Sequence, residues 1–210
     1  MNPRSYVTTS MPRSRQIAQA IASNKKSPFN NTTTLIWELP FGRDRRWGSN
    51  LGIAANALLG GWRVTAINTM TSGAPVNLSY SPAANAQVSG VPTYRPNISG
   101  DIYASGGQQS ITNWFDTASV IIPTDSSQPF GNAPRNAARG PAIYVLDLGL
   151  HKSIPLVSRS RMEFRVEVFN LFNRSNFATP NGNRSSTAFG TITSLATTPR
   201  QVQLGVKVDF

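Results

Sequence analysis

Acidic and basic side chains alternate with apolar ones between residues 161 and 168, and the two carboxylates among them are candidates for acid–base chemistry. Glu163 and Glu167 lie four positions apart, with Arg165 between them. On a strand these carboxylates share one face but lie roughly 13 Å apart. The paired carboxylates of a glycosidase lie within about 10 Å of each other, so these two alone do not form such a site. A ladder of charges on one strand face, with Lys207 as a cross-strand partner, is the simpler interpretation.

His151 is the single histidine of the chain, so a Ser-His-Asp triad would have to use it as the base. Asp147 lies on the same predicted strand face, but no nucleophile motif accompanies the many Ser and Thr residues. The chain has no Cys, which excludes a disulfide framework, a thiolate metal site and a Cys nucleophile. One histidine also disfavours a His-based metal site. We therefore predict that the protein is not an enzyme and has no catalytic residues, metal site or cofactor.

These charged residues belong to segments that alternate with period two, the pattern of a β-strand with one apolar face. From residue 200 to the C-terminus the alternation is unbroken, and the segment is about as long as a tilted strand that crosses a bilayer. The same pattern covers residues 160–172 and 142–152. It slips near Phe169, which suggests a bulge, and Pro155 predicts a short turn to the next strand.

Two further strands are expected earlier in the chain. One runs from Thr32 to Leu39, and the other runs from Trp62 towards Tyr80 with an interruption at residues 72–75. Between them we predict a short helix, with Asn50 as its N-cap and Gly60 as its end. The segments 1–31, 82–140 and 174–199 are rich in Gly, Pro, Ser and Asn and are expected to be loops.

Strands of about ten residues joined by alternately short and long connections are typical of a transmembrane β-barrel. Only 14% of the residues are charged, against about 25% in an average soluble protein. We predict an all-β fold, an antiparallel barrel segment that is an open sheet when isolated. Residues 1–31 are expected to be a loop or the remnant of a preceding strand, and residues 32–81 to be two strands joined by a turn that contains a short helix. A long extracellular loop (82–140), a hairpin (141–173), a second loop (174–199) and a C-terminal strand (200–210) follow.

Aromatic residues provide a second test, because a barrel carries aromatic belts at both membrane interfaces. We place the C-terminus on the periplasmic side. The expected periplasmic group is then Trp37, Trp62 and Phe210, and the expected outer group is Tyr80, Tyr144, Phe169 and Phe172. The alternative is that these side chains fill the core of a soluble β-sandwich that binds polyanions or carbohydrate.

The net charge of +11 raises the question of a nucleic-acid partner. Because the basic residues are spread from Arg4 to Lys207, and the densest group at residues 43–46 looks like a turn, we predict no nucleic acid. Residues 1–15 contain no apolar core and are not expected to be a signal peptide, so an exported protein would be incomplete at this end.

The C-terminus resembles the assembly signal of outer-membrane proteins. Its elements are the polar Gln203, Gly205 two positions later, the apolar Val208 and the terminal aromatic Phe210. By this resemblance, the barrel-assembly machinery would capture the last strand through its free edge. The surrounding partners would be outer-membrane lipids.

Other motifs resemble the TonB-dependent outer-membrane receptors, in particular those with a carboxypeptidase-regulatory-like domain, and they occur in that family's order. They are Glu38-Leu-Pro-Phe-Gly-Arg43, Leu59-Gly-Gly-Trp-Arg63, Ser72-Gly-Ala-Pro75, Gly131-Asn-Ala-Pro-Arg-Asn136, Arg139-Gly-Pro141, Val166-Glu-Val-Phe-Asn-Leu-Phe-Asn173 and Asn176-Phe177. Each also has a structural interpretation: glycines and prolines form turns, and Asn170 and Asn173 supply polar partners where a strand leaves the membrane.

The resemblance implies the C-terminal β-barrel portion of such a receptor in the bacterial cell outer membrane, about the last five of about 22 strands. Receptors of this family import scarce ligands such as siderophores, cofactors or oligosaccharides with energy delivered through TonB. The plug domain that closes the barrel and meets TonB is absent from these residues. The chain is therefore expected to contribute to transport only as part of a whole receptor.

Overall fold

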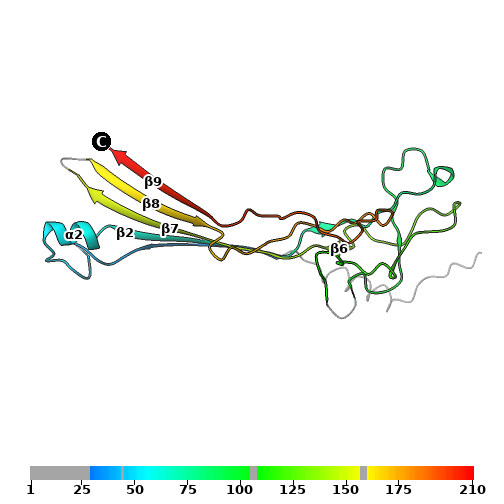
Figure 1. The fold of residues 1–210 in the computed structure, drawn as a ribbon, viewed down its shortest axis with the longest axis horizontal. Coiled ribbons are helices and arrows are strands. Elements are labelled where there is room, and N and C mark those ends of the chain that lie inside the picture. Colours follow the sequence, from blue (N-terminus) through cyan, green and yellow to red (C-terminus); the bar gives the residue numbers. More distant parts are fainter. Residues whose placement is uncertain (1–28, 44, 105–107, 157–159) are drawn as a thin grey trace, which may run out of the picture.

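Five strands form one antiparallel sheet in the order β1-β2-β7-β8-β9 (Figure 1). They are β1 (Asn30–Glu38), β2 (Trp62–Thr71), β7 (Ile143–Pro155), β8 (Arg161–Phe169) and β9 (Gln201–Asp209). The structure, a computed structural model, describes residues 29–210 except residues 44, 105–107 and 157–159. The prediction for residues 1–31 therefore lies almost entirely outside the described residues. The all-β antiparallel fold is confirmed, and the sheet is open, with β1 and β9 at its edges.

The pairing register places every second residue of each strand on the same face of the sheet. Because paired residues in an antiparallel sheet point to the same side, the even-numbered residues of β2, β7, β8 and β9 share one face with the odd-numbered residues of β1. This is the apolar face, and the opposite one is the polar face. No second sheet covers the apolar face among the described residues, and Leu204 is 75% exposed there. Within the described residues, these side chains therefore do not form a sandwich core.

Two of the connections and the C-terminus lie at the same end of the sheet, which we call the turn end (Figure 1). Residues 156–160 join β7 to β8, and residues 39–61 join β1 to β2 and contain helix α2 (Ile53–Leu59). Gly60 is the C-cap of α2, as predicted, but the N-cap is Gly52 and not Asn50. The reason is that the chain first makes a turn, in which the Leu51 N–H donates to the Gly48 carbonyl, before the first helical bond forms at Gly52.

The opposite end, the loop end, carries the long connections, which pack on one another as a loop layer (Figure 1). The layer contains two small sheets, β3 (Pro75–Val76) with β6 (Ala138–Arg139) and β4 (Asn97–Ile98) with β5 (Val120–Ile121), and a short 3-10 helix, η1 (Ala84–Ala86). Its core consists of Val76, Leu78, Ile102, Phe115, Val120, Ala137, Ala138 and Phe189. Weak periodicity in these segments therefore indicated loops correctly but did not reveal that the loops share a hydrophobic core.

Asparagines tie the ends of the strands to this layer. Asn170 follows the last residue of β8, has a φ of 50° and donates its N–H to the Asp147 carboxylate at 2.8 Å. Its side chain accepts from the Arg174 N–H and donates to the Thr198 carbonyl. The predicted bulge near Phe169 is wrong, because the register with β9 is regular up to that residue. The pattern slips there because the strand ends and Asn170 adopts a left-handed conformation.

Tyr80 belongs to the loop layer. It is 5% exposed, and its hydroxyl donates to the Pro129 carbonyl. It therefore packs inside the loops and does not lie at a membrane interface, where the sequence pattern had placed it. Among the described residues, no helix combines the length and apolar character needed to cross a membrane.

Candidate functional site

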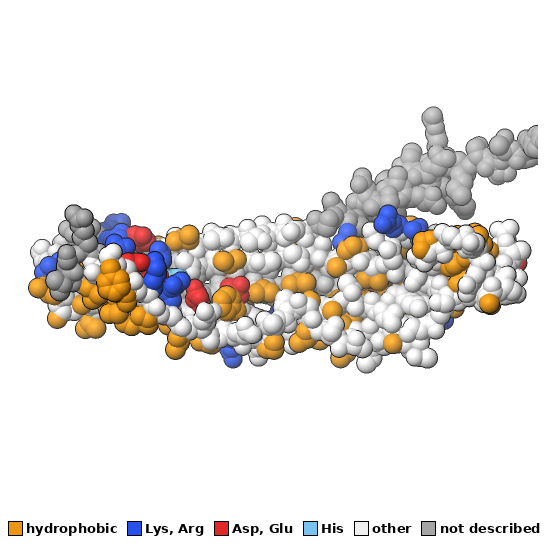
Figure 2. Space-filling model, turned by 90° about the horizontal axis from the view of Figure 1, so that it is seen from above, with side chains coloured by type: hydrophobic (Ala, Val, Ile, Leu, Met, Phe, Trp, Pro, Cys, Tyr) orange, Lys and Arg blue, Asp and Glu red, His pale blue; other side chains and the backbone are white. Residues whose placement is uncertain are grey.

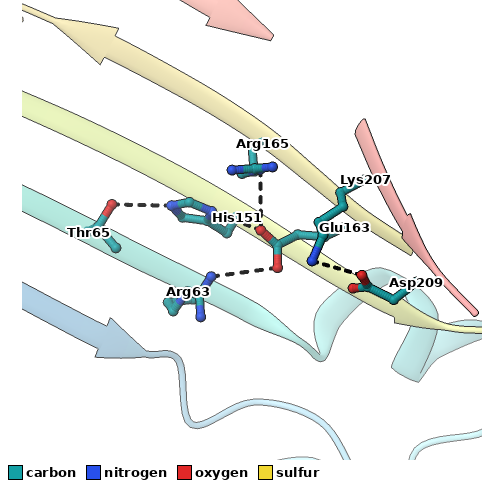
Figure 3. Close-up of polar contacts among 7 residues, drawn as sticks. All are labelled: Arg63, Thr65, His151, Glu163, Arg165, Lys207 and Asp209. Atoms are coloured by element: carbon teal, nitrogen blue, oxygen red, sulfur yellow. Dashed lines mark hydrogen bonds and ion pairs between the residues drawn. The ribbon is translucent and has the colours of Figure 1, made fainter. Parts of the chain in front are cut away.

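Charged side chains on the polar face gather around one carboxylate near the turn end (Figures 2 and 3). Glu163 of β8 lies within ion-pair distance of three cationic or ionisable groups: Arg63 Nη2 at 3.6 Å, His151 Nδ1 at 3.4 Å and Arg165 Nε at 3.5 Å. The residues come from three adjacent strands and meet because the register pairs Arg63 with His151 and His151 with Arg165. We call Arg63, Thr65, His151, Glu163 and Arg165 the Glu163 cluster.

His151 is the most enclosed member of the cluster, 9% exposed. Its ring lies between Glu163 and Thr65, whose hydroxyl is 3.3 Å from Nε2. Gly149, two residues earlier on the same face, leaves room for this contact. A Cβ at that position would lie 2.4 Å from the Thr65 hydroxyl oxygen and 3.0 Å from His151 Nε2. A glycine in the middle of β7 therefore allows the histidine ring to lie flat against the sheet.

The cluster has more donors than its carboxylate can satisfy. The Nε atoms of Arg63 and Arg165 are buried and have no hydrogen-bond partner within the described ranges. The 3.5 Å separation from Glu163 brings Arg165 Nε within ion-pair range but is too long for a well-formed hydrogen bond. Beside Arg63 lies an open hollow of about 470 Å³, which is also bordered by Arg43, Gly60 and Arg161. The buried Nε atoms face away from solvent, but the Arg63 and Arg165 side chains are 39% and 38% exposed, so the cluster presents a cationic surface to an anionic or carbonyl-rich partner.

The predicted cross-strand pair of Glu163 and Lys207 does not form. The two residues are paired in the register, but the Lys207 ammonium lies 2.8 Å from Asp209 on its own strand. The Glu163 carboxylate instead turns towards His151 and the two arginines, where it is more enclosed (Figure 3). Both partners of the Lys207–Asp209 pair are half exposed, and such pairs contribute little to stability.

Thr65, His151 and Glu163 are in contact in that order, and this arrangement resembles the hydroxyl, imidazole and carboxylate of a catalytic triad. Glu163 takes the carboxylate position for which Asp147 was considered from the sequence. Asp147 is occupied elsewhere, as the acceptor of the Asn170 N–H. Thr65 lies on a central strand whose backbone N–H groups are used by the ladders to β1 and β7. No pair of free N–H groups is left beside it to stabilise an oxyanion. Within the part of the chain that is described, no group of three or more His, Asp or Glu side chains could hold a metal ion.

A comparison with protein families identifies the architecture. The family model described as an outer membrane beta barrel domain matches residues 4–203. The chain belongs to this outer membrane β-barrel family. No curated protein and no solved structure matches it. The protein is therefore located in the outer membrane, its apolar face meets lipid and its polar face, with the Glu163 cluster, borders the lumen.

In this β-barrel the predicted interface aromatics divide between the two faces. Trp37 and Trp62 lie on the lipid face near the turn end, and Tyr144 lies on the lipid face near the loop end, stacked on Phe172 at 6.3 Å. Phe169 pairs with Gln201 and lies on the lumenal face. Phe169 is therefore an apolar side chain on the otherwise polar face, and it is the last residue of β8.

The proposed assembly residues lie on the edge strand β9 or just beyond it. Gln203 and Gly205 are on the lumenal face, opposite Glu167 and Arg165, while Val208 is on the lipid face. Phe210 is 99% exposed. A Cβ at Gly205 would make only an ordinary contact of 3.9 Å with Arg165 Cβ, so no backbone atom of this sheet comes close enough to require a glycine there.

Sequence analysis missed Lys152, which occupies an apolar-face position in β7. Its ammonium donates to the Gly60 carbonyl and lies 5.2 Å from the centre of the Trp62 ring. It is 7% exposed. The sequence could have predicted this position, because the alternation of β7, continued past Leu150, places Lys152 on the apolar face.

The Glu163 cluster makes a testable contribution to stability. Replacing Glu163 by Gln should lower the free energy of unfolding by about 1–3 kcal/mol, because two partly buried guanidinium groups lose their counter-charge. Urea titration of the barrel in lipid bilayers measures the change. Asp209→Asn removes the exposed carboxylate of the other ion pair and should cost less than about 0.5 kcal/mol. Equal effects of the two substitutions would mean that the cluster has no special electrostatic role.

Proposed function

We propose that this chain is a wall segment of a TonB-dependent outer-membrane receptor that takes part in energy-dependent uptake of a scarce ligand of the siderophore, cofactor or oligosaccharide class. One observation carries the proposal: a polar face with partly exposed cationic groups belongs to the same wall as a loop layer that has its own core. A receptor needs an ordered outer surface to select a ligand and a polar lumen to accept a plug and pass the ligand.

The loop layer supports a selective surface, because its connections are held by buried side chains and not only by solvent-exposed turns. Phe115 is fully buried and packs on Phe189 with ring centroids 5.5 Å apart. Asp116 and Asp125 form local turns with Ser119 and Ser127, and these side-chain hydrogen bonds hold the pKa of each carboxyl below its ordinary value. We propose that this layer faces the cell exterior and that the turn end faces the periplasm.

The remaining partners follow from the same proposal. Lipids surround the apolar face, and the barrel-assembly machinery takes hold of β9 through the edge that carries Gln203, Gly205, Val208 and Phe210. TonB acts on the receptor through the plug region and not through these residues. We propose no nucleic-acid partner for the chain, because its basic residues are spread from Arg4 to Lys207, and no catalytic role or cofactor, because the Glu163 cluster has no nucleophile beside an oxyanion site.

Uptake by living cells tests the function. Cells with the intact gene and cells with a deletion are compared for uptake of a labelled ferric siderophore, cobalamin and an oligosaccharide. We expect at least one compound to enter only cells with the gene, and a protonophore that collapses the proton gradient should abolish its entry. Gene-dependent uptake that survives the protonophore would indicate a passive pore, and no gene-dependent uptake of any of the three would contradict the proposed ligand classes.

A further inference from the structure

We propose that the connection between β1 and β2, residues 39–61, is an interfacial anchor that inserts α2 into the bilayer surface at the turn end and places Arg46 on phospholipid headgroups. The inference rests on the lipid-facing wall and on the proposed periplasmic position of the turn end, and it does not depend on transport. Without such an anchor, this connection between two strands would lie in water.

Helix α2 has the composition of a buried helix but is not buried by protein. Six of its seven residues, IAANALL, are apolar, and a helix that is apolar on all sides normally lies in a core or in lipid. Yet Ile53 is 79% exposed, Leu58 is 73% exposed and Leu59 is 54% exposed. The single polar residue, Asn56, points inward, where its side-chain oxygen accepts the Arg43 N–H at 2.7 Å.

The C-terminal turn of α2 is attached to the lipid face of the wall. Its orphan carbonyls are satisfied by two side chains of that face, because the Trp62 indole donates to Leu58 O at 2.8 Å and the Lys152 ammonium donates to Gly60 O. The exposed leucines are thus continuous with the lipid-facing residues of β2 and β7. A lysine on a lipid face is tolerated near the interface, where it costs far less than at the bilayer centre.

The rest of the connection has the residue types found at the level of lipid headgroups. Phe41 and Trp47 are in ring contact at 5.2 Å, and both are about half exposed. The Arg46 guanidinium lies 5.7 Å from the centre of the Trp47 ring. Basic and apolar side chains meet at this end of the molecule in Figure 2. Tryptophan and arginine side by side suit an interface in which the ring is half in hydrocarbon and the cation meets phosphate.

The connection is also basic overall, which fits anionic phospholipid. It contains Arg43, Arg45 and Arg46 against one aspartate, Asp44. Arg45 is paired with Glu38 of β1 at 2.7 Å, which fixes the base of the loop to the strand. The Arg43 side chain donates to the Leu51 carbonyl at 2.9 Å and so braces the turn before α2. Arg46 contacts the exposed Trp47 ring and is the arginine placed to meet a headgroup.

Spin labels on single cysteines test the anchor, and the chain is suited to this because it has no native Cys. The whole protein is labelled at Leu58→Cys in bilayers of phosphatidylcholine with phosphatidylglycerol, and relaxation by oxygen and by a water-soluble nickel complex is measured. Leu204→Cys and Gln203→Cys mark the lipid and lumenal sides of β9, and Gln128→Cys marks an exposed loop. We expect the Leu58 label to resemble the Leu204 label and to be shielded from nickel.

The possible outcomes distinguish a failure of the anchor from a failure of the lipid-facing wall assignment. A Leu58 label as accessible to nickel as the Gln128 label overturns the anchor, provided that the Leu204 and Gln203 labels still differ. If those two labels do not differ, the wall itself is misassigned and the anchor falls with it.

The headgroup contact has its own measurement. Omitting phosphatidylglycerol should move the Leu58 label towards water, and Arg46→Gln should remove that dependence on lipid charge. A label depth that is the same in both bilayers would contradict the contact between arginine and phosphate.

Discussion

Replacement of Asn176 by Ala is expected to lower the free energy of unfolding by about 2–4 kcal/mol, one of the two largest effects in the chain. The side chain is 1% exposed and acts as a substitute strand residue for the start of β7. Its oxygen accepts the Tyr144 N–H at 2.9 Å, and its amide donates to the Tyr144 carbonyl at 3.0 Å and to the Thr197 hydroxyl at 3.0 Å. Ala leaves these partly buried groups of Tyr144 and Thr197 without those partners.

Urea unfolding in bilayers, followed by tryptophan fluorescence, measures this loss. Asn176→Asp should fall between the wild type and the Ala variant, because it keeps the acceptor for the Tyr144 N–H and loses the donor. Asn50→Ala is the matched control, since Asn50 is exposed in the turn-end connection and should change stability by less than about 0.5 kcal/mol. If Asn176→Ala behaves like Asn50→Ala, the asparagine motif after β8 is not a structural clamp.

Gly61→Ala is the second large effect, with an expected loss of about 2–5 kcal/mol from two separate causes. Gly61 has a φ of 70°, where an L side chain costs about 1–2 kcal/mol. A Cβ there would lie 2.3 Å from the Ser153 carbonyl oxygen, a backbone atom that cannot rotate away. The shift required would also break the bond from the Ser153 N–H to the Gly61 carbonyl, which is 2.9 Å long. The turn at the start of β2 therefore depends on this glycine.

Gly52→Ala provides the comparison within the same connection. Gly52 has a φ of −64°, and an added Cβ meets nothing within 4 Å. Its replacement should be neutral or stabilise by about 0.4–1 kcal/mol through the unfolded chain. Urea unfolding and the amount of protein recovered in outer-membrane fractions both report the difference. Equal recovery and equal stability of the Gly61 and Gly52 variants would disprove the steric argument.

Several local features of the molecule could be predicted because they depend on neighbours in sequence. The apolar face of β9 follows from the alternation of Val202, Leu204 and Val206 alone. The role of Asn170 at the end of β8 was predicted from its residue type, and its side-chain hydrogen bonds with the Arg174 N–H and carbonyl, four positions later, bear this out. Gly60 ends α2 as predicted. Where two local signals competed, as for Asn50 and Gly52 at the start of α2, the turn geometry of residues 48–51 decided between them.

The site itself depends on tertiary structure. Period-two alternation determines that Arg63, His151 and Glu163 each lie on a polar strand face, because successive side chains of an extended chain point to opposite sides. It does not determine which of them meet, since β2 and β7 pair across the long loop segment that separates them in the sequence. The register of that pairing results from contacts among side chains that no local pattern connects, whereas the Lys207–Asp209 pair forms between residues two apart on one strand.

The sequence by itself therefore determined the strands, their two faces and the membrane setting of this protein. The tertiary structure alone decided the Glu163 cluster, the shared core of the loop layer and the position of α2 against Trp62 and Lys152. The physical reason is the range of the interactions: alternation and turn formation are properties of a few consecutive residues, whereas register and loop packing are set by contacts between residues far apart in the chain.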